Sequence, residues 1–425
     1  MIPNSFKKFR SEDWFGYLFA SLVFLAPLYV WRFQLSGLPV NFLMVFLPLL
    51  WLAAIIDISL RSAWSEFIKN LQTVPAYIRC STALFFLAAT VSLFALPISQ
   101  NALGQYLVWI VEPIITAGFA LWYWRNFSMS NHPLIIVAYL FVAASGFFAL
   151  IQFFTFIGLP ATWWGNAVEP KRAISFFQHP NGFSLFVGPL LALVLPDLSD
   201  RLLKRERSGI LALLAWLFGL AGLIVSLSRG SWFGVAAAIA LFVVVKGNWK
   251  VWLAGLGAAV ITLVLIFNIP HLKYRLILPF YGEKSASARL SLWQTGWAMV
   301  KDKPILGQGL TGFSEKWVKF NHDSALDHYN FPHNIFLNFW ISTGLFGLIA
   351  FVGLCGRIFW LGWARSVTEM AQATALALVV IFVHGMIDIP YFKNDLALLF
   401  WLFIAFAITG LGYQNPTRQP GSVLK

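Results

Sequence analysis

Apolar runs of about 20 residues recur along the whole chain, and they constrain its fold more than any other feature. A helical run of that length matches the thickness of a lipid bilayer. The composition agrees, because 59% of the 425 residues are hydrophobic, only 11% are charged, and the mean hydropathy is +0.74. We therefore expect an all-α integral membrane protein, organised as a single polytopic domain over residues 1–425.

The length rule predicts about twelve transmembrane helices. They cover residues 15–31, 40–58, 82–98, 107–124, 134–156, 183–195, 210–227, 232–245, 251–268, 335–360, 371–389 and 396–411. Lys and Arg are concentrated in the short connections on one side, which places both termini in the cytoplasm. The long polar interval 270–334 is then an outer, periplasmic loop of an inner membrane protein.

The net charge of +13 could indicate a nucleic-acid partner, but the basic residues are scattered between apolar runs. Orientation in the bilayer and contact with anionic membrane lipids explain this distribution better. We therefore expect membrane lipids, and no nucleic acid, among the partners of this chain.

The outer loop 270–334 has the spacing of amphipathic helices. One apolar face consists of Leu290, Trp293, Trp297 and Val300, and a second consists of Phe313, Trp317 and Phe320. Lys303-Pro304 followed by Gly307 ends the first helix. Such helices would lie along a membrane surface, and we expect their aromatic rings to contact the membrane; the alternative is that these rings form platforms on which sugars stack.

Three arginines lie at predicted outer ends of spans. Arg172 precedes the segment HPNG at 179–182, Arg229 lies in the tight turn SLSRG, and Arg289 begins the amphipathic helix. Arginines in such places can snorkel to lipid headgroups, which is the alternative to a functional role. Because a guanidinium binds phosphate oxygens in a bidentate manner, Arg172, Arg229 and Arg289 could together bind a diphosphate.

His333 and Asn334 lie where the helix over 335–360 must begin. The positive end of a helix favours a neutral imidazole, so His333 could act as a general base. The alternative is that His333 only caps the helix or bonds a loop carbonyl.

Further polar side chains lie within predicted spans. Glu112 is inside the fourth span, where it could form a buried hydrogen bond at a kink or line a substrate cavity. His384 and Asp388 are four residues apart and share a helix face. Asp388 could hold an active-site arginine, or the two could form a structural pair.

Acidic and histidine residues also cluster in HDSALDHYNFPH, which contains His322, Asp323, Asp327, His328 and His333. Their spacing matches no defined metal site, so we expect no metal and no cofactor.

The segments SLSRGSWFG, SARLSLWQTGWAMVKDKPILGQG and HNIFLNFWISTGLFG resemble the O-antigen ligase and O-antigen polymerase superfamily of bacterial envelope glycan enzymes. The resemblance spans roughly residues 210–358, which would be the ligase- or polymerase-like core, and it is looser in RAISFFQHPNGF and HGMIDIPYFKNDL. It implies a membrane glycosyltransferase on the outer face of the inner membrane. The donor would be an undecaprenyl-diphosphate-linked glycan. The acceptor would be lipid A-core for a lipopolysaccharide ligase, or another glycan repeat unit for a polymerase.

The resemblance also implies roles for individual residues. His333 would be catalytic, and Arg229, Arg289 and, less directly, Arg172 would bind the donor diphosphate. Asp388, Glu112 and Asn334 would support the site. The first outer loop, RFQLSGLP, lacks the acidic pair of metal-dependent oligosaccharyltransferases, which favours a metal-independent enzyme.

The alternative function is a transporter of polysaccharide or of a lipid-linked glycan. An outward cavity with Arg229, Arg289 and His333 would favour the enzyme, and an inverted repeat around a midplane site would favour the transporter.

Overall fold

The computed structural model describes residues 11–35, 37–125, 127–166, 170–246, 268, 284–323, 326–363 and 368–411. The helices are α1 (Ser11–Leu25), α2 (Phe42–Leu60), α3 (Trp64–Gln72), α4 (Ala76–Ser92), α5 (Gln100–Tyr106), α6 (Glu112–Trp124), α7 (Pro133–Thr155), α8 (Pro180–Leu193), α9 (Leu195–Leu203), α10 (Arg207–Val225), α11 (Arg229–Lys246), α14 (Lys284–Asp302), α15 (Gly312–Glu315), α16 (Trp317–Phe320), α17 (Ile335–Trp363), α18 (Glu369–Gly385) and α19 (Asn394–Thr409). Short 3₁₀ turns are η1 (Ala26–Val30), η2 (Leu93–Ala95), η4 (Met129–Asn131) and η5 (Ala161–Trp163), and η3 (Leu107–Val111) is a π-helical turn.

Apolar helices dominate the described part, which confirms the all-α membrane class. Seven of them are long and apolar enough to cross a membrane, at Phe42–Leu60, Ala76–Ala95, Gln100–Trp124, Pro133–Thr155, Arg207–Val225, Arg229–Lys246 and Ile335–Trp363. The pair α8 and α9, bent by 40°, would make an eighth, and Trp14–Val30, α18 and α19 are shorter apolar helices. The total of twelve stays a prediction, because the ninth run, 251–268, lies almost entirely outside the described residues.

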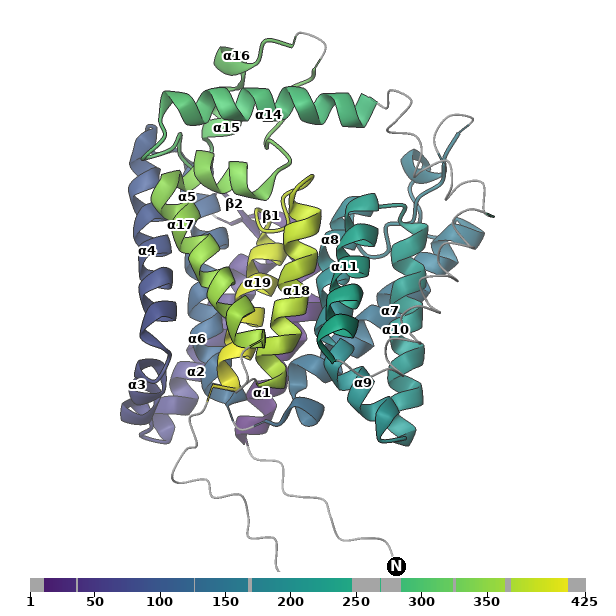
Figure 1. The fold of residues 1–425 in the computed structure, drawn as a ribbon. Helices are drawn as coiled ribbons and strands as arrows, with labels where there is room; N and C mark the ends of the chain where they lie inside the picture. The colour runs from purple at the N-terminus through teal and green to yellow at the C-terminus, as the bar shows by residue number, and fades with distance from the viewer. Residues whose placement is uncertain are drawn as a thin grey trace, which may run out of the picture.

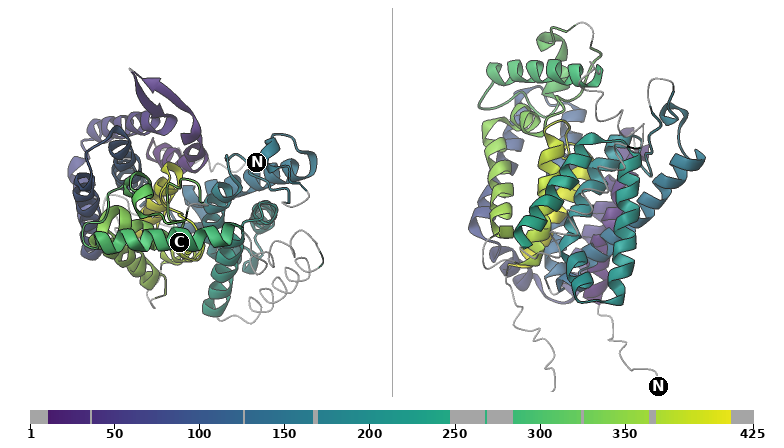
Figure 2. Two further views of the ribbon diagram at one scale, coloured as in Figure 1. Left: turned by 90° about the horizontal axis from the view of Figure 1, so that it is seen from above. Right: turned by 45° about the vertical axis from the view of Figure 1, so that its right-hand side comes forward.

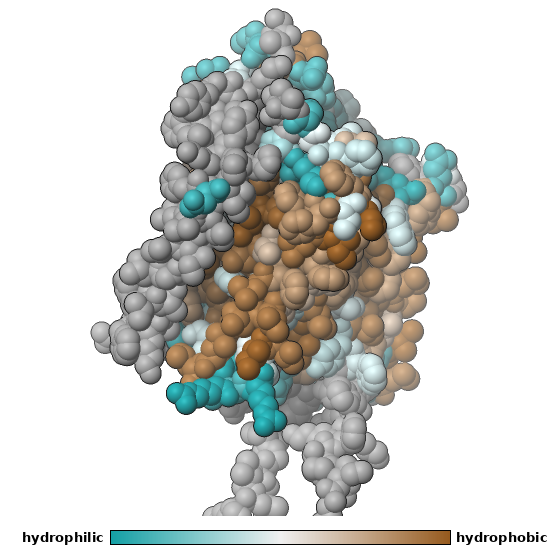
Figure 3. Space-filling model, turned by 90° about the vertical axis from the view of Figure 1, so that its right-hand side faces the viewer, coloured by the Kyte–Doolittle hydropathy of each residue, from teal (hydrophilic) through white to brown (hydrophobic). Residues whose placement is uncertain are grey.

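The molecular surface has the banding of a membrane protein. In Figure 3 a brown, hydrophobic zone covers the middle of the visible face, and teal, hydrophilic residues gather above and below it. Large exposed side chains such as Leu49, Leu211 and Phe154 belong to the spanning helices, and their exposure is favourable only in contact with lipid.

Consecutive spans run in opposite directions, so every second connection lies at the same end of the bundle. We call the end where α14 lies the upper end (Figure 1). The described residues of the connections 156–179, 226–228 and 386–393 lie at this end, together with those of the segment 284–334, whereas α3 and α9 lie at the opposite end (Figures 1 and 2). Which end faces the periplasm stays a prediction.

The connection between α1 and α2 contains strands that the sequence did not indicate. Residues Arg32–Leu35 form β1 and Leu38–Asn41 form β2, an antiparallel hairpin with Arg32 opposite Asn41. The predicted loop RFQLSGLP is therefore a hairpin, and Asn41 then caps α2 by accepting hydrogen bonds from the amides of Leu43 and Met44.

The described residues of 284–334, which contain α14, α15 and α16, form a small cap with its own hydrophobic core. The buried members of this core are Leu292, Met299, Val300, Phe313, Trp317 and Ile341. The rings of Phe313 and Trp317 are therefore buried in the cap. They neither contact the membrane, which the sequence predicted, nor form platforms for sugars, which was the alternative. Leu290 and Trp297 remain exposed on α14, whereas Val300, which the sequence placed on the same apolar face, is buried.

The helix predicted as one span over 335–360 is broken at Gly344. This residue has φ 71°, a left-handed conformation that glycine adopts without steric cost. A Cβ atom at this position would lie 2.2 Å from the carbonyl oxygen of Ile305. The loop 303–309 packs into the break through two backbone hydrogen bonds. The backbone N–H of Gln308 donates to the carbonyl of Ile341 at 2.6 Å, and that of Leu345 donates to the carbonyl of Ile305 at 3.0 Å. The break thus attaches the cap to the spanning part of α17.

Candidate functional site

His333 and Asp388 meet at the upper end of the bundle. Nδ1 of His333 lies 3.1 Å from Oδ1 of Asp388, although the residues are 55 positions apart. The Asp388 side chain is only 6% exposed, whereas 29% of the His333 side chain remains accessible. One edge of the imidazole is therefore held by a buried carboxylate, and the ring can still be reached from outside.

Asp388 lies in the connection 386–393, just beyond the end of α18 at Gly385. Burial on its own would raise the pKa of Asp388, but the hydrogen bond with His333 and the nearby charges of His333, His384 and Lys393 hold that pKa well below its usual range. An ionised carboxylate only accepts hydrogen bonds. An ionised Asp388 therefore makes Nδ1 of His333 the donor, and in the tautomer that carries this proton alone, Nε2 is the basic atom.

Asn181 connects this pair to Arg172. Nδ2 of Asn181 donates to Oδ2 of Asp388 at 3.1 Å, and Nη2 of Arg172 donates to Oδ1 of Asn181 at 2.7 Å. Nε of Arg172 also donates to the carbonyl of Ser226, at 2.9 Å, in the turn that leads to Arg229. Asp388 was expected to hold an arginine directly. Within the described residues it is instead joined to Arg172 through Asn181.

Arg289 approaches the site from the cap. Its Nε donates to the carbonyl of Ile387 at 3.0 Å, next to Asp388 in the chain. Trp293, one turn further along α14, donates its indole N–H to the carbonyl of His333 at 3.4 Å. The start of the amphipathic helix predicted from the sequence therefore lies directly against the His333 and Asp388 pair.

Arg229 begins α11, and its neighbour Gly230 packs tightly on His384. A Cβ atom at Gly230 would lie 2.2 Å from Cδ2 of His384. His384 is also close enough to Asp388 and Arg289 to interact with both electrostatically. Among the described residues, no hydrogen bond joins His384 to Asp388, and Nδ1 of His384 is buried without a partner. The alternative of a structural pair between the two therefore rests on electrostatic attraction, and it stays a prediction.

His333 differs in its contacts from the histidines that cap helices. Nδ1 of His132 accepts the amide of Leu134 at 3.2 Å, and Nδ1 of His179 accepts the amide of Asn181 at 3.1 Å. At the start of α17 the cap is Asn334, whose Oδ1 accepts the amide of Leu337 at 3.0 Å. Capping is thus performed by Asn334, and Nδ1 of His333 is directed at Asp388.

Asn334 also holds the connection that contains Asp388, because its Nδ2 donates to the carbonyl of Met386 at 3.1 Å. His333 itself has φ 49°, a left-handed conformation that costs a non-glycine residue about 1–3 kcal/mol. This strain is retained at the residue whose ring meets Asp388.

Two polar residues that sequence reasoning did not single out belong to the same cluster. Asn181 belongs to the segment HPNG and Lys393 to the segment HGMIDIPYFKNDL, and the sequence had indicated no role for either side chain. A Cβ atom at Gly182 would lie 3.7 Å from Nζ of Lys393, so this ammonium lies at the start of α8. Desolvation and the positive charges of Arg172 and Lys393 lower the pKa of His179 to about 4. The similar tripeptides HPN at 179–181 and PHN at 332–334 both lie at helix starts, and this similarity could have indicated Asn181 from the sequence.

Glu112 lies apart from this cluster. It is buried at the start of α6, directly after the π-helical turn, and about 18 Å along the span that begins at Gln100. Its backbone carbonyl accepts the hydroxyl of Thr116 at 2.7 Å, but its carboxylate forms no hydrogen bond with a described residue. The kink predicted at this position is thus the π-helical turn, and a supporting role for the side chain stays a prediction.

Two of the acidic and histidine residues of 322–328 bind groups of the cap. Asp323 accepts the hydroxyl of Ser291 at 2.8 Å, and Nε2 of His328 lies 3.0 Å from the carbonyl of Ser314. In the described part of the chain, no group of three or more His, Cys, Asp or Glu residues is arranged to hold a metal ion.

Comparison with known proteins covers the central part of the chain. Residues 212–352 match the family model described as O-antigen ligase, a range that includes Arg229, Arg289 and His333. An O-antigen ligase of Salmonella typhimurium (strain LT2) is 28% identical over an aligned length of 199 residues, and the alignment covers 43% of this chain. The chain covers 43% of the length of that relative. Together with the motifs at 226–234, 287–309 and 333–347, these matches show that the central part of the chain is similar to O-antigen ligases.

Proposed function

We propose that this protein is a membrane glycosyltransferase that moves a glycan from a lipid diphosphate to the hydroxyl of an acceptor. The observation that supports it most directly is the contact of His333 with buried Asp388, at the end of the bundle where several cationic side chains gather. The superfamily match over 212–352 supports the same reaction class.

The cationic side chains suit the diphosphate of the donor. Arg172, Arg289 and Lys393 each lie within one or two contacts of Asp388, and Arg229 lies beside the glycine that packs on His384. Negative charge accumulates on the diphosphate as the glycosidic bond breaks. Fixed cations therefore stabilise the transition state more than the ground state, which is the condition for a rate increase.

His333 suits the role of general base. The acceptor oxygen attacks the anomeric carbon, its proton moves to Nε2 of His333, and the bond from that carbon to the phosphate oxygen breaks. The lipid diphosphate leaves with the bonding electron pair. Asp388 keeps Nδ1 protonated and stabilises the imidazolium that forms, as in other base pairs of histidine and carboxylate.

We propose a single displacement with inversion at the anomeric carbon. A double displacement would need a carboxylate with a free oxygen as nucleophile. The oxygens of Asp388 already accept hydrogen bonds from His333, Asn181 and the amide of Ile389. The side chains that hold the diphosphate supply positive charge themselves, so the proposed reaction uses no metal ion and no cofactor.

The finer assignments follow from the family. We propose an undecaprenyl-diphosphate-linked glycan as donor and the outer face of the inner membrane as the place of reaction. The acceptor would be a lipid-anchored core glycan for a ligase, or another repeat unit for a polymerase. In this arrangement the upper end is periplasmic and both termini are cytoplasmic.

The test is transfer by the purified full chain in lipid nanodiscs. Undecaprenyl-diphosphate-linked glycan is supplied with lipid A-core or with free repeat units, each with and without a chelator. We expect acceptor-dependent release of undecaprenyl diphosphate that is insensitive to the chelator, and a product of inverted anomeric configuration. Movement of intact donor across vesicles without any covalent product would instead identify a transporter and refute the proposal.

A further inference from the structure

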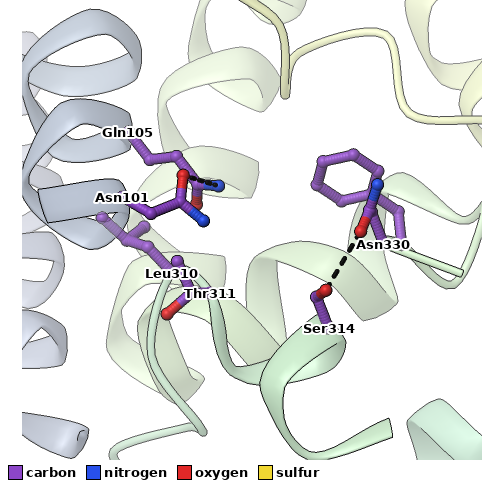
Figure 4. Close-up of a pocket in the computed structure, with 7 residues that line it drawn as sticks. Asn101, Gln105, Leu310, Thr311, Ser314 and Asn330 are labelled. Carbon is purple, nitrogen blue, oxygen red and sulfur yellow. Dashed lines mark hydrogen bonds between the residues drawn. The ribbon is translucent and has the colours of Figure 1, made fainter. Parts of the chain in front are cut away.

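A polar pocket lies at the upper end, on the α5 side of the bundle. It has a volume of about 190 Å³ and is lined by Asn101, Gln105, Leu310, Thr311, Ser314, Asn330 and Phe331. Figure 4 shows the amides of Asn101 and Gln105 on one side, and Ser314, Asn330 and an aromatic ring across from them. Asn101 and Asn330 are exposed, so the pocket can be entered from solvent.

The lining is uncharged, and its polar groups both donate and accept hydrogen bonds. It consists of three amides, two hydroxyls and two apolar side chains. Phosphate groups and carboxylates are normally held by Arg or Lys, which this lining does not offer. A neutral ligand with several hydroxyl groups matches amide and hydroxyl partners, and its apolar ring face matches an aromatic side chain.

Two buried polar atoms, one in the pocket lining and one on Trp109 behind the lining residue Phe331, have unmet hydrogen-bonding capacity. Oε1 of Gln105 is buried without a partner among the described residues, and so is Nε1 of Trp109, one helical turn further along. Trp109 packs on Phe331 with the ring centroids 6.1 Å apart. Buried polar groups are rarely left unpaired, so the unpaired acceptor oxygen of Gln105 in the lining favours a ligand that donates a hydrogen bond.

The pocket adjoins the base through the chain itself. Asn330 and Phe331 immediately precede Pro332 and His333, so the Cα atoms of Phe331 and His333 are at most about 7 Å apart. The cations lie in the connection before α8, on α11 and α14, and in the connection after α18, whereas the pocket is lined by residues of α5 and α15 and of the chain next to α15 (Figure 1). The proton that a base removes comes from the acceptor, so the acceptor is the substrate expected beside His333 and away from the cations.

We propose that this pocket binds one uncharged sugar residue of the acceptor glycan and positions its hydroxyl toward His333. The assignment to the acceptor rests on the proposed glycan transfer. The volume of about 190 Å³ lies below the range of about 300–1,000 Å³ for drug-sized ligands, which suits a single sugar ring.

Binding without donor is the first test. The full chain in nanodiscs is titrated with methyl glycosides of glucose, galactose and N-acetylglucosamine, and with methyl glucuronide as an anionic probe, by saturation-transfer NMR. At least one neutral glycoside should bind, and the glucuronide should bind no more tightly. Gln105→Leu should weaken the binding about tenfold, since it removes polar contacts while keeping a side chain of similar size.

Asn101→Leu, at an exposed position of the same lining, is the second variant in case Gln105→Leu does not fold. The matched control is Gln100→Leu, which replaces an exposed amide on the same helix that does not line the pocket. Neutral glycosides that do not bind the wild type, or that bind both pocket variants as tightly as the wild type, would overturn the inference.

The transfer assay then identifies which substrate the pocket serves. Gln105→Leu should raise the KM for the acceptor about tenfold and leave the KM for the donor unchanged. A raised donor KM with an unchanged acceptor KM would overturn the assignment to the acceptor. Sugar binding that depends on Gln105 in a protein that transfers no glycan would support the pocket and refute the proposed function.

Discussion

His333→Asn distinguishes base catalysis from every structural role of this histidine. Asparagine removes the basic ring nitrogen, and a positioned general base contributes about 10²- to 10⁴-fold in rate. At 1.36 kcal/mol for each factor of ten, the barrier should rise by about 2.7–5.4 kcal/mol. We therefore expect turnover to fall by at least 10²-fold at saturating donor and acceptor.

The structure predicts that the variant still folds. The helix cap at α17 is made by Asn334, so it remains in place. The hydrogen bond from His333 to Asp388 is lost or weakened, which costs about 1.5–3 kcal/mol for a bond to a charged group. Asparagine tolerates the left-handed backbone at φ 49°, so no additional backbone strain is introduced.

The assay combines three measurements on protein in nanodiscs: single-turnover release of the lipid diphosphate, donor affinity, and the thermal unfolding midpoint. The matched control is His132→Asn, because Nδ1 of His132 caps α7 and its ring is packed against Trp124 and Phe406 far from the site. The control should unfold at lower temperature while each folded molecule keeps the native rate. A near-native rate in His333→Asn would refute the assignment of this residue as base.

The remaining predictions concern the cations, the carboxylate, the break in α17 and the topology. Arg289→Lys should lower turnover about 10- to 100-fold with unchanged net charge, because the planar fork that binds phosphate is lost; native kinetics in this variant would make Arg289 a surface charge only. Asp388→Asn should lower turnover about 10²-fold or more while donor affinity stays native, because an amide can donate as well as accept and no longer fixes the proton on Nδ1 of His333. Kinetics equal to those of the wild type would exclude a catalytic role for the contact between Asp388 and His333. Gly344→Ala should lower the free energy of unfolding by about 2–5 kcal/mol, whereas Gly356→Ala in the same helix, where nothing lies within 4 Å, should not, as thermal unfolding can compare. A cysteine at Ser314 should be labelled by an impermeant reagent from the periplasmic side, and labelling from the cytoplasmic side alone would invert the proposed topology.

Much of the architecture could be predicted from the sequence, because the bilayer imposes a local rule on it. The length of an apolar run decides whether a segment can cross, and the alternation of runs decides which connections share an end. Arg172, Arg229, Arg289 and His333 were placed on one side by that alternation, and the described helices bring their positions to the upper end. The motifs of 226–234 and 333–347 were sufficient to indicate the superfamily, as the family match confirms.

The tertiary structure alone decided which side chains meet. Asn181 and Asp388 are 207 positions apart, and Arg289 and the carbonyl it binds are 98 apart, so no local periodicity relates them. Asp388 was expected to hold an arginine, and it binds His333 and Asn181 because its connection leaves the helix after Gly385 and turns toward α17 and α8. The partner of a buried carboxylate depends on the packing of three separate helices, whereas the length of an apolar run depends only on neighbouring residues. The sequence by itself therefore determined the membrane class and the shared end, and helix packing determined the hydrogen-bond network of the site.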